Sequence, residues 1–155
     1  MSQVTLGKAI PPFKAVSTQG DISLEGLRGH LAVLYFYPKD NTPGCTTQAQ
    51  DFRDRYQEFV DTGCHIIGIS RDSLKSHAGF TDKQSLPFPL ISDDSETLCE
   101  LFGVMKLKNM YGKQVRGIER STFLIDTHGL LLREWRGVRV PGHVDEVLQT
   151  VRDSV

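Results

Sequence analysis

The sequence predicts an α/β protein in which helices flank a mixed central sheet. Three observations lead to this fold class. Residues 31–37 form an apolar, aromatic-rich run that is typical of a strand buried on both faces. Strand-like and helix-like segments then alternate along the middle of the chain. Finally, residues 121–126 and 130–135 flank a Thr-His-Gly turn, which predicts a β-hairpin.

The remaining elements follow in chain order. The first residues, through Pro12, predict an irregular arm, and the next strands predict a short hairpin around Gly20. Before the buried strand, residues 23–29 favour a turn or a single helical turn. After it, apolar residues recur at helical spacing, so we expect one helix from Cys45 to the stop at Gly63.

The second half of the chain continues the alternation. We expect a strand over 65–70, a helix from Asp72 or Ser73 to about 84, an extended segment over 87–92, a short helix over 95–102 and a C-terminal amphipathic helix from Gly142. Residues 105–117 are polar, and we expect them to form a long solvated loop. Alternating strands and helices followed by a hairpin are typical of the thioredoxin-like fold, here with an N-terminal extension. We expect a single domain over residues 1–155.

Composition limits the function classes. The chain has 155 residues, of which 39% are hydrophobic and 24% charged, and its net charge of −1 does not suggest a nucleic-acid surface. No window approaches the ~20 apolar residues of a membrane span. The first residues do not show a basic segment followed by an apolar run, so we expect a cytoplasmic protein.

The chain has three cysteines, Cys45, Cys64 and Cys99. An odd number argues against a disulfide framework, and no CxxC motif occurs. Each is therefore buried filler, a metal ligand or a reactive thiol. Cys45 lies in the first turn of a predicted helix, where free backbone N–H groups and the helix dipole favour negative charge. This position favours the thiolate, which is the nucleophilic form of the side chain.

The residues before Cys45 carry a resemblance. Pro38-Lys39-Asp40-Asn41-Thr42-Pro43-Gly44-Cys45 resembles the Pro-x-x-x-Thr-x-x-Cys signature of peroxiredoxins, which are thiol peroxidases, and FYPKDNTPGCT is similar to the PrxQ, or bacterioferritin comigratory protein, type. Further matches follow in order along nearly the whole chain, among them Gly68-Ile69-Ser70-Arg71-Asp72 and Arg120-Ser121-Thr122-Phe123-Leu124-Ile125-Asp126.

The resemblance implies a role for each site residue. Cys45 would attack the peroxide, and Thr42 would hydrogen-bond the substrate. Arg120 would stabilise both thiolate and peroxide with its fixed charge, and Pro38 would shield the sulfur. The N–H groups of Gly44 and Cys45 would complete the donor set, with Gln48 holding the arginine in place.

The attack leaves a sulfenic acid on Cys45, which a second thiol must resolve. Gln50 and Thr81 occupy the two positions at which PrxQ proteins keep that cysteine. We therefore expect a one-cysteine mechanism in a monomer, with thioredoxin, glutaredoxin or glutathione as external reductant. A two-cysteine mechanism with Cys99 as resolver is the alternative. Neither a cofactor nor a metal is expected, because the five histidines lack ligand spacing.

Two other functions compete with a peroxidase for hydrogen peroxide and organic hydroperoxides. A thiol–disulfide oxidoreductase would suit the fold, and Thr42-x-x-Cys45 has CxxC spacing, but its first cysteine is missing. A chaperone or binding module is the second alternative. It would keep its function when Cys45 is replaced by serine.

Overall fold

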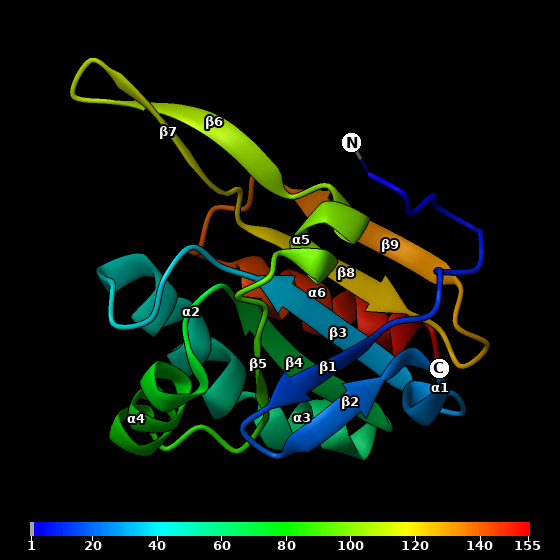
Figure 1. The fold of residues 1–155 in the computed structure, drawn as a ribbon. Helices are drawn as coiled ribbons and strands as arrows, with labels where there is room; N and C mark the ends of the chain where they lie inside the picture. The colour runs from blue at the N-terminus through cyan, green and yellow to red at the C-terminus, as the bar shows by residue number, and fades with distance from the viewer. Residues whose placement is uncertain (1) are drawn as a thin grey trace.

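The computed structural model describes residues 2–155 and contains a seven-stranded sheet with helices on both faces (Figure 1). The strand order in the sheet is β2-β1-β5-β4-β3-β8-β9, and β6 and β7 form a separate two-stranded sheet. The strands are β1 (Lys14–Ser17), β2 (Gly20–Ser23), β3 (Leu31–Phe36), β4 (Cys64–Ser70), β5 (Leu90–Ser92), β6 (Met105–Met110), β7 (Lys113–Ile118), β8 (Ser121–Ile125) and β9 (Leu131–Arg136). The helices are α1 (Leu24–Leu27), α2 (Pro43–Asp54), α3 (Tyr56–Asp61), α4 (Leu74–Gln84), α5 (Thr97–Phe102) and α6 (His143–Asp153).

Strand β3 lies inside the sheet between β4 and β8, and all six of its residues are buried. It runs parallel to β4 and antiparallel to β8, so the sheet is mixed, as predicted. Successive side chains of a strand point to opposite faces. Leu31, Val33 and Tyr35 accordingly pack in one core with α2, α3, α4 and α6. The alternate residues of β3 pack in a second core with α1, α5 and the N-terminal segment.

Four chain segments meet at one edge of this sheet. The parallel strands β3, β4 and β5 all end there. Strand β8 starts there, because it is antiparallel to β3 and Ser121 pairs with Phe36. The loop that follows β3 therefore lies beside the residues that directly precede β8, although the two are far apart in the sequence.

Most predicted elements are confirmed, including both hairpins, the helix after Ser73 and the C-terminal helix. Ser73 caps α4 by accepting a hydrogen bond from the Ser76 N–H at 3.1 Å. The single helix expected from Cys45 to Gly63 is wrong in detail. It begins two residues earlier, at Pro43, and breaks at Arg55 into α2 and α3.

The long loop expected over residues 105–117 is wrong. Strands β6 and β7 pair in antiparallel register there, joined by Tyr111 and Gly112, which have φ of 53° and 79°. Positive φ at both central residues is the geometry of a type I′ hairpin turn. The sequence signal was weak because most side chains on both faces of this hairpin are exposed, so neither strand has a consistently apolar face. The hairpin stands clear of the main sheet (Figure 1).

Among residues 2–155, no helix is long and apolar enough to cross a bilayer.

Candidate active site

Cys45 lies in the first turn of α2, at the sheet edge where β3 ends. Thr42 occupies the N-cap position in an extended conformation, and Pro43 follows as the first helical residue, a position that tolerates the missing N–H. The first helical hydrogen bond runs from the Thr46 N–H to the Thr42 carbonyl at 2.9 Å. The N–H groups of Gly44 and Cys45 precede this bond and point out of the helix start. Cys45 itself is only 2% exposed.

Arg120 reaches Cys45 across 75 residues of sequence, because it directly precedes β8 beside the end of β3. Its Nη2 donates to Cys45 Sγ at 3.5 Å. A Cβ atom at Gly44 would lie 3.1 Å from the same Nη2, so glycine at this position leaves the space that the guanidinium occupies. The predicted closeness of Arg120 and Cys45 is therefore present in the structure.

Gln48 lies one helical turn after Cys45 and is fully buried. Its Oε1 accepts a hydrogen bond from Arg120 Nη1 at 2.6 Å. One guanidinium thus contacts both the sulfur and the glutamine, a geometry that suits the planar fork of arginine. Gln48 Nε2 is buried without a hydrogen-bond partner among the described residues, so it is an unused donor next to the site.

Thr42 and Pro38 complete the group of predicted residues. Thr42 Oγ1 donates to the Lys39 carbonyl at 2.8 Å, which uses its proton within the loop and leaves its lone pairs to accept a hydrogen bond. Pro38 is half-buried and lies two residues after the end of β3. All the predicted site residues except Cys99 therefore come from α2, the loop before it and the start of β8.

Residues 6–133 match the AhpC/TSA family. This chain belongs to that family, which makes it a peroxiredoxin. It is 48% identical to Peroxiredoxin Bcp of Bacillus subtilis over 151 residues, covering 97% of this chain and 96% of the relative. It is 54% identical to Peroxiredoxin Bcp of Xanthomonas campestris over 130 residues, covering 84% and 81%.

A solved structure gives the same result. The bacterioferritin comigratory protein of Xanthomonas campestris, from work on its alkyl peroxide reduction activity, superposes with a TM-score of 0.90 at 46% identity, covering 99% of both chains. The predicted thioredoxin-like fold and PrxQ type are thereby confirmed. As a PrxQ-type peroxiredoxin, the chain is a thiol-dependent peroxidase, an oxidoreductase that uses a peroxide and a thiol reductant.

The loop of this peroxiredoxin that carries Pro38 and Thr42 is anchored by Asp40, which sequence reasoning missed. The Asp40 carboxylate is buried and accepts from Tyr37 Oη at 2.7 Å and from Ser76 Oγ at 2.8 Å. Its backbone N–H donates to Asp72 Oδ2 at 2.9 Å. Asp40 therefore joins the loop to α4 and to the end of β4. An acidic residue five positions before the cysteine, shortly after the apolar run of β3, is the sequence signal that was available.

His77 is the other half of this anchor. Its Nδ1 lies 2.7 Å from Asp40 Oδ2, and its Nε2 donates to the Ile91 carbonyl at 2.9 Å. Asp40, Asp72 and His77 could each offer one atom to a metal ion. Both His77 nitrogens are already engaged by protein atoms, however, so the group is better described as a hydrogen-bonded anchor.

Tyr35 packs under the site, stacked on Phe52 with ring centroids 4.6 Å apart. Burial raises the pKa of its phenol well above the ordinary value, and the neighbouring charge of Cys45 adds to this. Tyr35 Oη has no hydrogen-bond partner among the described residues. Tyr35 therefore contributes an uncharged aromatic ring to the core beneath the site.

The other two thiols of the peroxiredoxin lie away from Cys45. Cys99 belongs to the core on the opposite face of the sheet and is fully buried. Burial raises the pKa of its thiol, and Asp93 adds to this. Cys64 pairs with Leu31 at the far end of β3, and burial raises the pKa of its thiol to about 12. Neither environment favours a thiolate.

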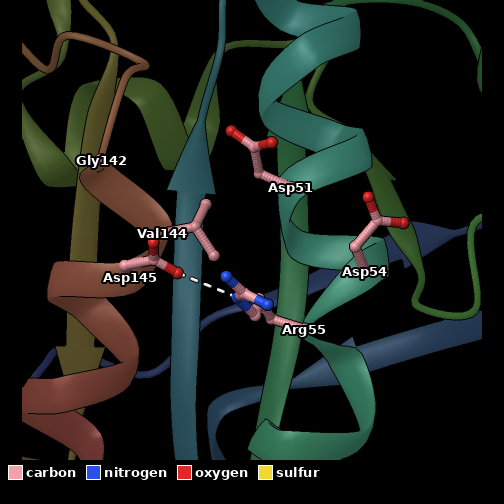
Figure 2. A pocket seen from close by; sticks show the side chains of 6 residues that line it. All are labelled: Asp51, Asp54, Arg55, Gly142, Val144 and Asp145. Carbon is pink, nitrogen blue, oxygen red and sulfur yellow. Dashed lines mark hydrogen bonds and ion pairs between the residues drawn. The ribbon is translucent and has the colours of Figure 1, made fainter.

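A hollow of about 240 Å³ lies between α2 and the start of α6 (Figure 2). It is lined by three carboxylates around Arg55, whose Nε donates to Asp145 Oδ1 at 2.9 Å. Desolvation raises the pKa of the Asp51 carboxyl, and the nearby Asp54 and Asp145 carboxylates add to this. The hollow gives the α2–α6 surface an acidic character.

Proposed function

We propose that this peroxidase reduces hydrogen peroxide and organic hydroperoxides by a one-cysteine cycle centred on Cys45. The observation that carries the proposal is the contact of one guanidinium, that of Arg120, with both Cys45 Sγ and Gln48 Oε1. The guanidinium places a fixed positive charge against the sulfur, which attacks as the thiolate.

In the first half-reaction, the Cys45 thiolate attacks the distal peroxide oxygen in line with the O–O bond. The O–O bond breaks, an S–O bond forms, and the departing oxygen takes a proton and leaves as water or an alcohol. Negative charge develops on that oxygen, where the guanidinium of Arg120 and the N–H groups of Gly44 and Cys45 can stabilise it. The Thr42 hydroxyl, with its proton held by Lys39, accepts from the peroxide O–H and orients it.

Gln48 acts through Arg120 as a positioning residue. Pro38 limits the access of water to the sulfur from the side of the loop. Because Cys45 is almost fully buried, its sulfur favours small or slender peroxides that can reach it.

In the second half-reaction, an external thiol reduces the sulfenic acid. This part of the proposal is supported by the positions of the other cysteines, because Cys45 and Cys99 pack on opposite faces of the sheet. Residues Gln50 and Thr81 provide no thiol either. We place the cycle in the cytoplasm, where three unpaired thiols stay reduced, and in a monomer.

Intact mass after one equivalent of hydrogen peroxide tests the cycle. We expect the gain of one oxygen, and an adduct at Cys45 when a sulfenic-acid trap is present. Cys64→Ser and Cys99→Ser should leave this result and the thiol-supported turnover unchanged. A rapid loss of two hydrogens that Cys99→Ser abolishes would instead establish Cys99 as the resolver.

A further inference from the structure

The β6–β7 hairpin occupies the segment that was expected to be a loop. It is positively charged and partly apolar. Residues 105–118 include three lysines and Arg116 but no acidic residue. Met110 is 50% exposed, Val115 is 43% exposed, and Tyr111 in the turn is fully exposed. A lone two-stranded hairpin has little stability of its own in water. Exposed apolar side chains gathered on such an element mark an interaction surface.

The strand register sorts these side chains onto two faces. Lys106 pairs with Gly117, Lys108 with Val115 and Met110 with Lys113, so their side chains share one face. We call Lys106, Lys108, Met110, Lys113 and Val115 the lysine face.

The opposite face of the hairpin contacts the body of the protein through Arg116. There Arg116 forms ion pairs with Glu96 and with Glu100 of α5. Among the described residues, no carboxylate forms an ion pair with any lysine of the lysine face. Lys108 Nζ donates to the Ile118 carbonyl at 2.8 Å, but no carboxylate in the described part of the chain neutralises the positive charge of this face.

The base of the hairpin is held next to the active site. Strand β7 ends at the buried Ile118, only two residues before Arg120. The intervening Glu119 donates its N–H to the Val104 carbonyl at 2.8 Å, which closes the base. From there the six-residue strands extend about 20 Å outward. The lysine face therefore belongs to an element whose base lies two residues from Arg120, the residue that contacts Cys45 Sγ.

We propose that the lysine face docks an acidic dithiol protein, which delivers the thiol that reduces oxidised Cys45. This inference rests on the one-cysteine cycle proposed above. Charge complementarity identifies the partner as acidic, and a long positive face beside the site would steer its approach.

Other occupants fit this surface less well. A second copy of the chain would bring lysines against lysines in a symmetric contact, which like charges disfavour. Glutathione is a tripeptide and needs no face of this length. Met110 and Val115, interleaved with the lysines, offer the apolar contact that protein interfaces use and a phosphate backbone does not.

The two thiols of the partner supply the reducing equivalents for the chemical step that follows docking. A thiolate of the partner attacks the sulfur of Cys45–SOH, the S–O bond breaks, and the hydroxide takes a proton and leaves as water. The second thiolate of the partner then attacks the partner's own sulfur in the mixed disulfide. Cys45 leaves as a thiolate, and the partner leaves as an oxidised disulfide.

The test compares two triple variants with the same change in net charge. The first is Lys106→Glu/Lys108→Glu/Lys113→Glu, and the matched control is Lys8→Glu/Lys14→Glu/Lys83→Glu at exposed positions outside the hairpin. Each protein is oxidised with one equivalent of hydrogen peroxide. The rate constant for its reduction is then measured with an acidic thioredoxin and, separately, with dithiothreitol.

We expect the hairpin variant to lose at least about tenfold in its rate constant with thioredoxin at low ionic strength, more than the control loses. Its rate constants with dithiothreitol and with peroxide should match those of the wild type. An equal loss in both variants, a parallel loss with dithiothreitol, or no reduction of the wild type by thioredoxin would overturn the proposal. Failure of Cys45 to react with peroxide at all would instead refute the one-cysteine cycle itself.

Discussion

Gln50 Nε2 donates a hydrogen bond to Gln84 Oε1 across 2.9 Å, joining the middle of α2 to the end of α4. Arg53 Nη1 adds a second link, to the Gln84 carbonyl at 2.8 Å. Gln50 stands where many PrxQ proteins keep a resolving cysteine. In this chain the position contributes a side-chain bond that holds the catalytic helix in place.

Gln50→Ala should lower the free energy of unfolding by about 1 kcal/mol, because it removes one partly buried hydrogen bond. The rate constant of Cys45 with peroxide should not change, since Gln50 makes no contact with Arg120 or Cys45. Urea denaturation and stopped-flow kinetics measure the two quantities. In a double-mutant cycle with Gln84→Ala, strictly additive losses would show that the two amides do not interact.

Arg120→Lys should lower the rate constant with peroxide by about 10- to 100-fold, although it keeps the charge. A lysine cannot contact the sulfur and Gln48 Oε1 together, and a hydrogen bond to a charged group contributes about 1.5–3 kcal/mol. Single-turnover kinetics measure this loss.

Gln48→Ala is the matched variant for the positioning role. It should cost less than Arg120→Lys, and adding it to Arg120→Lys should cost little more, because both act through one contact. Full additivity of the two losses would show that Gln48 does not work through Arg120.

Protonation of His143 should lower the free energy of unfolding at acidic pH. His143 lies at the start of α6, with its Nε2 2.8 Å from Thr122 Oγ1. Burial lowers the pKa of His143 to about 4; the nearby Glu146 carboxylate opposes this shift, and the charge of Arg120 adds to it. The unfolded chain therefore binds this proton more readily than the folded one. The stability that neutral His143 contributes is complete above about pH 6.5 and is lost as the pH falls toward 4, by at most about 3 kcal/mol.

His143→Asn removes that titration. The difference in free energy of unfolding between wild type and variant, measured by urea denaturation from pH 7.5 to 4.5, should shrink as the pH falls. Carboxylates that titrate in both proteins cancel in this difference. A difference that stays constant over the range would contradict the assignment to His143.

The Asp40–His77 contact joins α4 to the loop that carries Pro38 and Thr42. We therefore expect its removal to lower the stability of the protein and to disturb the active site. His77→Ala should lower the free energy of unfolding by about 3 kcal/mol, because it removes one of the two partners that lie 2.7 Å from the buried Asp40 carboxylate. Ser76→Ala, which removes a neutral donor to the same carboxylate, should cost only about 1 kcal/mol. Calorimetry or urea denaturation gives both values.

The same two variants separate anchoring from simple stability. If Asp40 positions the loop, His77→Ala should also slow the reaction of Cys45 with peroxide at a temperature where the variant is fully folded. An unchanged rate would show that the loop keeps its position without His77.

Local patterns allowed much of this fold to be predicted. The buried strand, both hairpins of the main sheet and the start of α4 follow from periodicity and turn residues, which are read within a few positions. The hairpin over residues 105–118 escaped prediction because its two faces are alike in exposure. Its pairing depends on backbone hydrogen bonds and on a turn at Tyr111 and Gly112, for which the side chains give little signal.

The sequence by itself determined the chemistry of this protein. It put a cysteine at a helix start, within a motif that resembles the peroxiredoxin signature, and it left the resolving positions without a thiol. The tertiary structure decided which residues meet. Arg120 contacts Cys45 because β8 runs antiparallel to β3, and Cys99 is separated from it because alternate faces of one sheet hold the two thiols. Such contacts depend on the order and direction of strands that are distant in sequence, which no local pattern specifies.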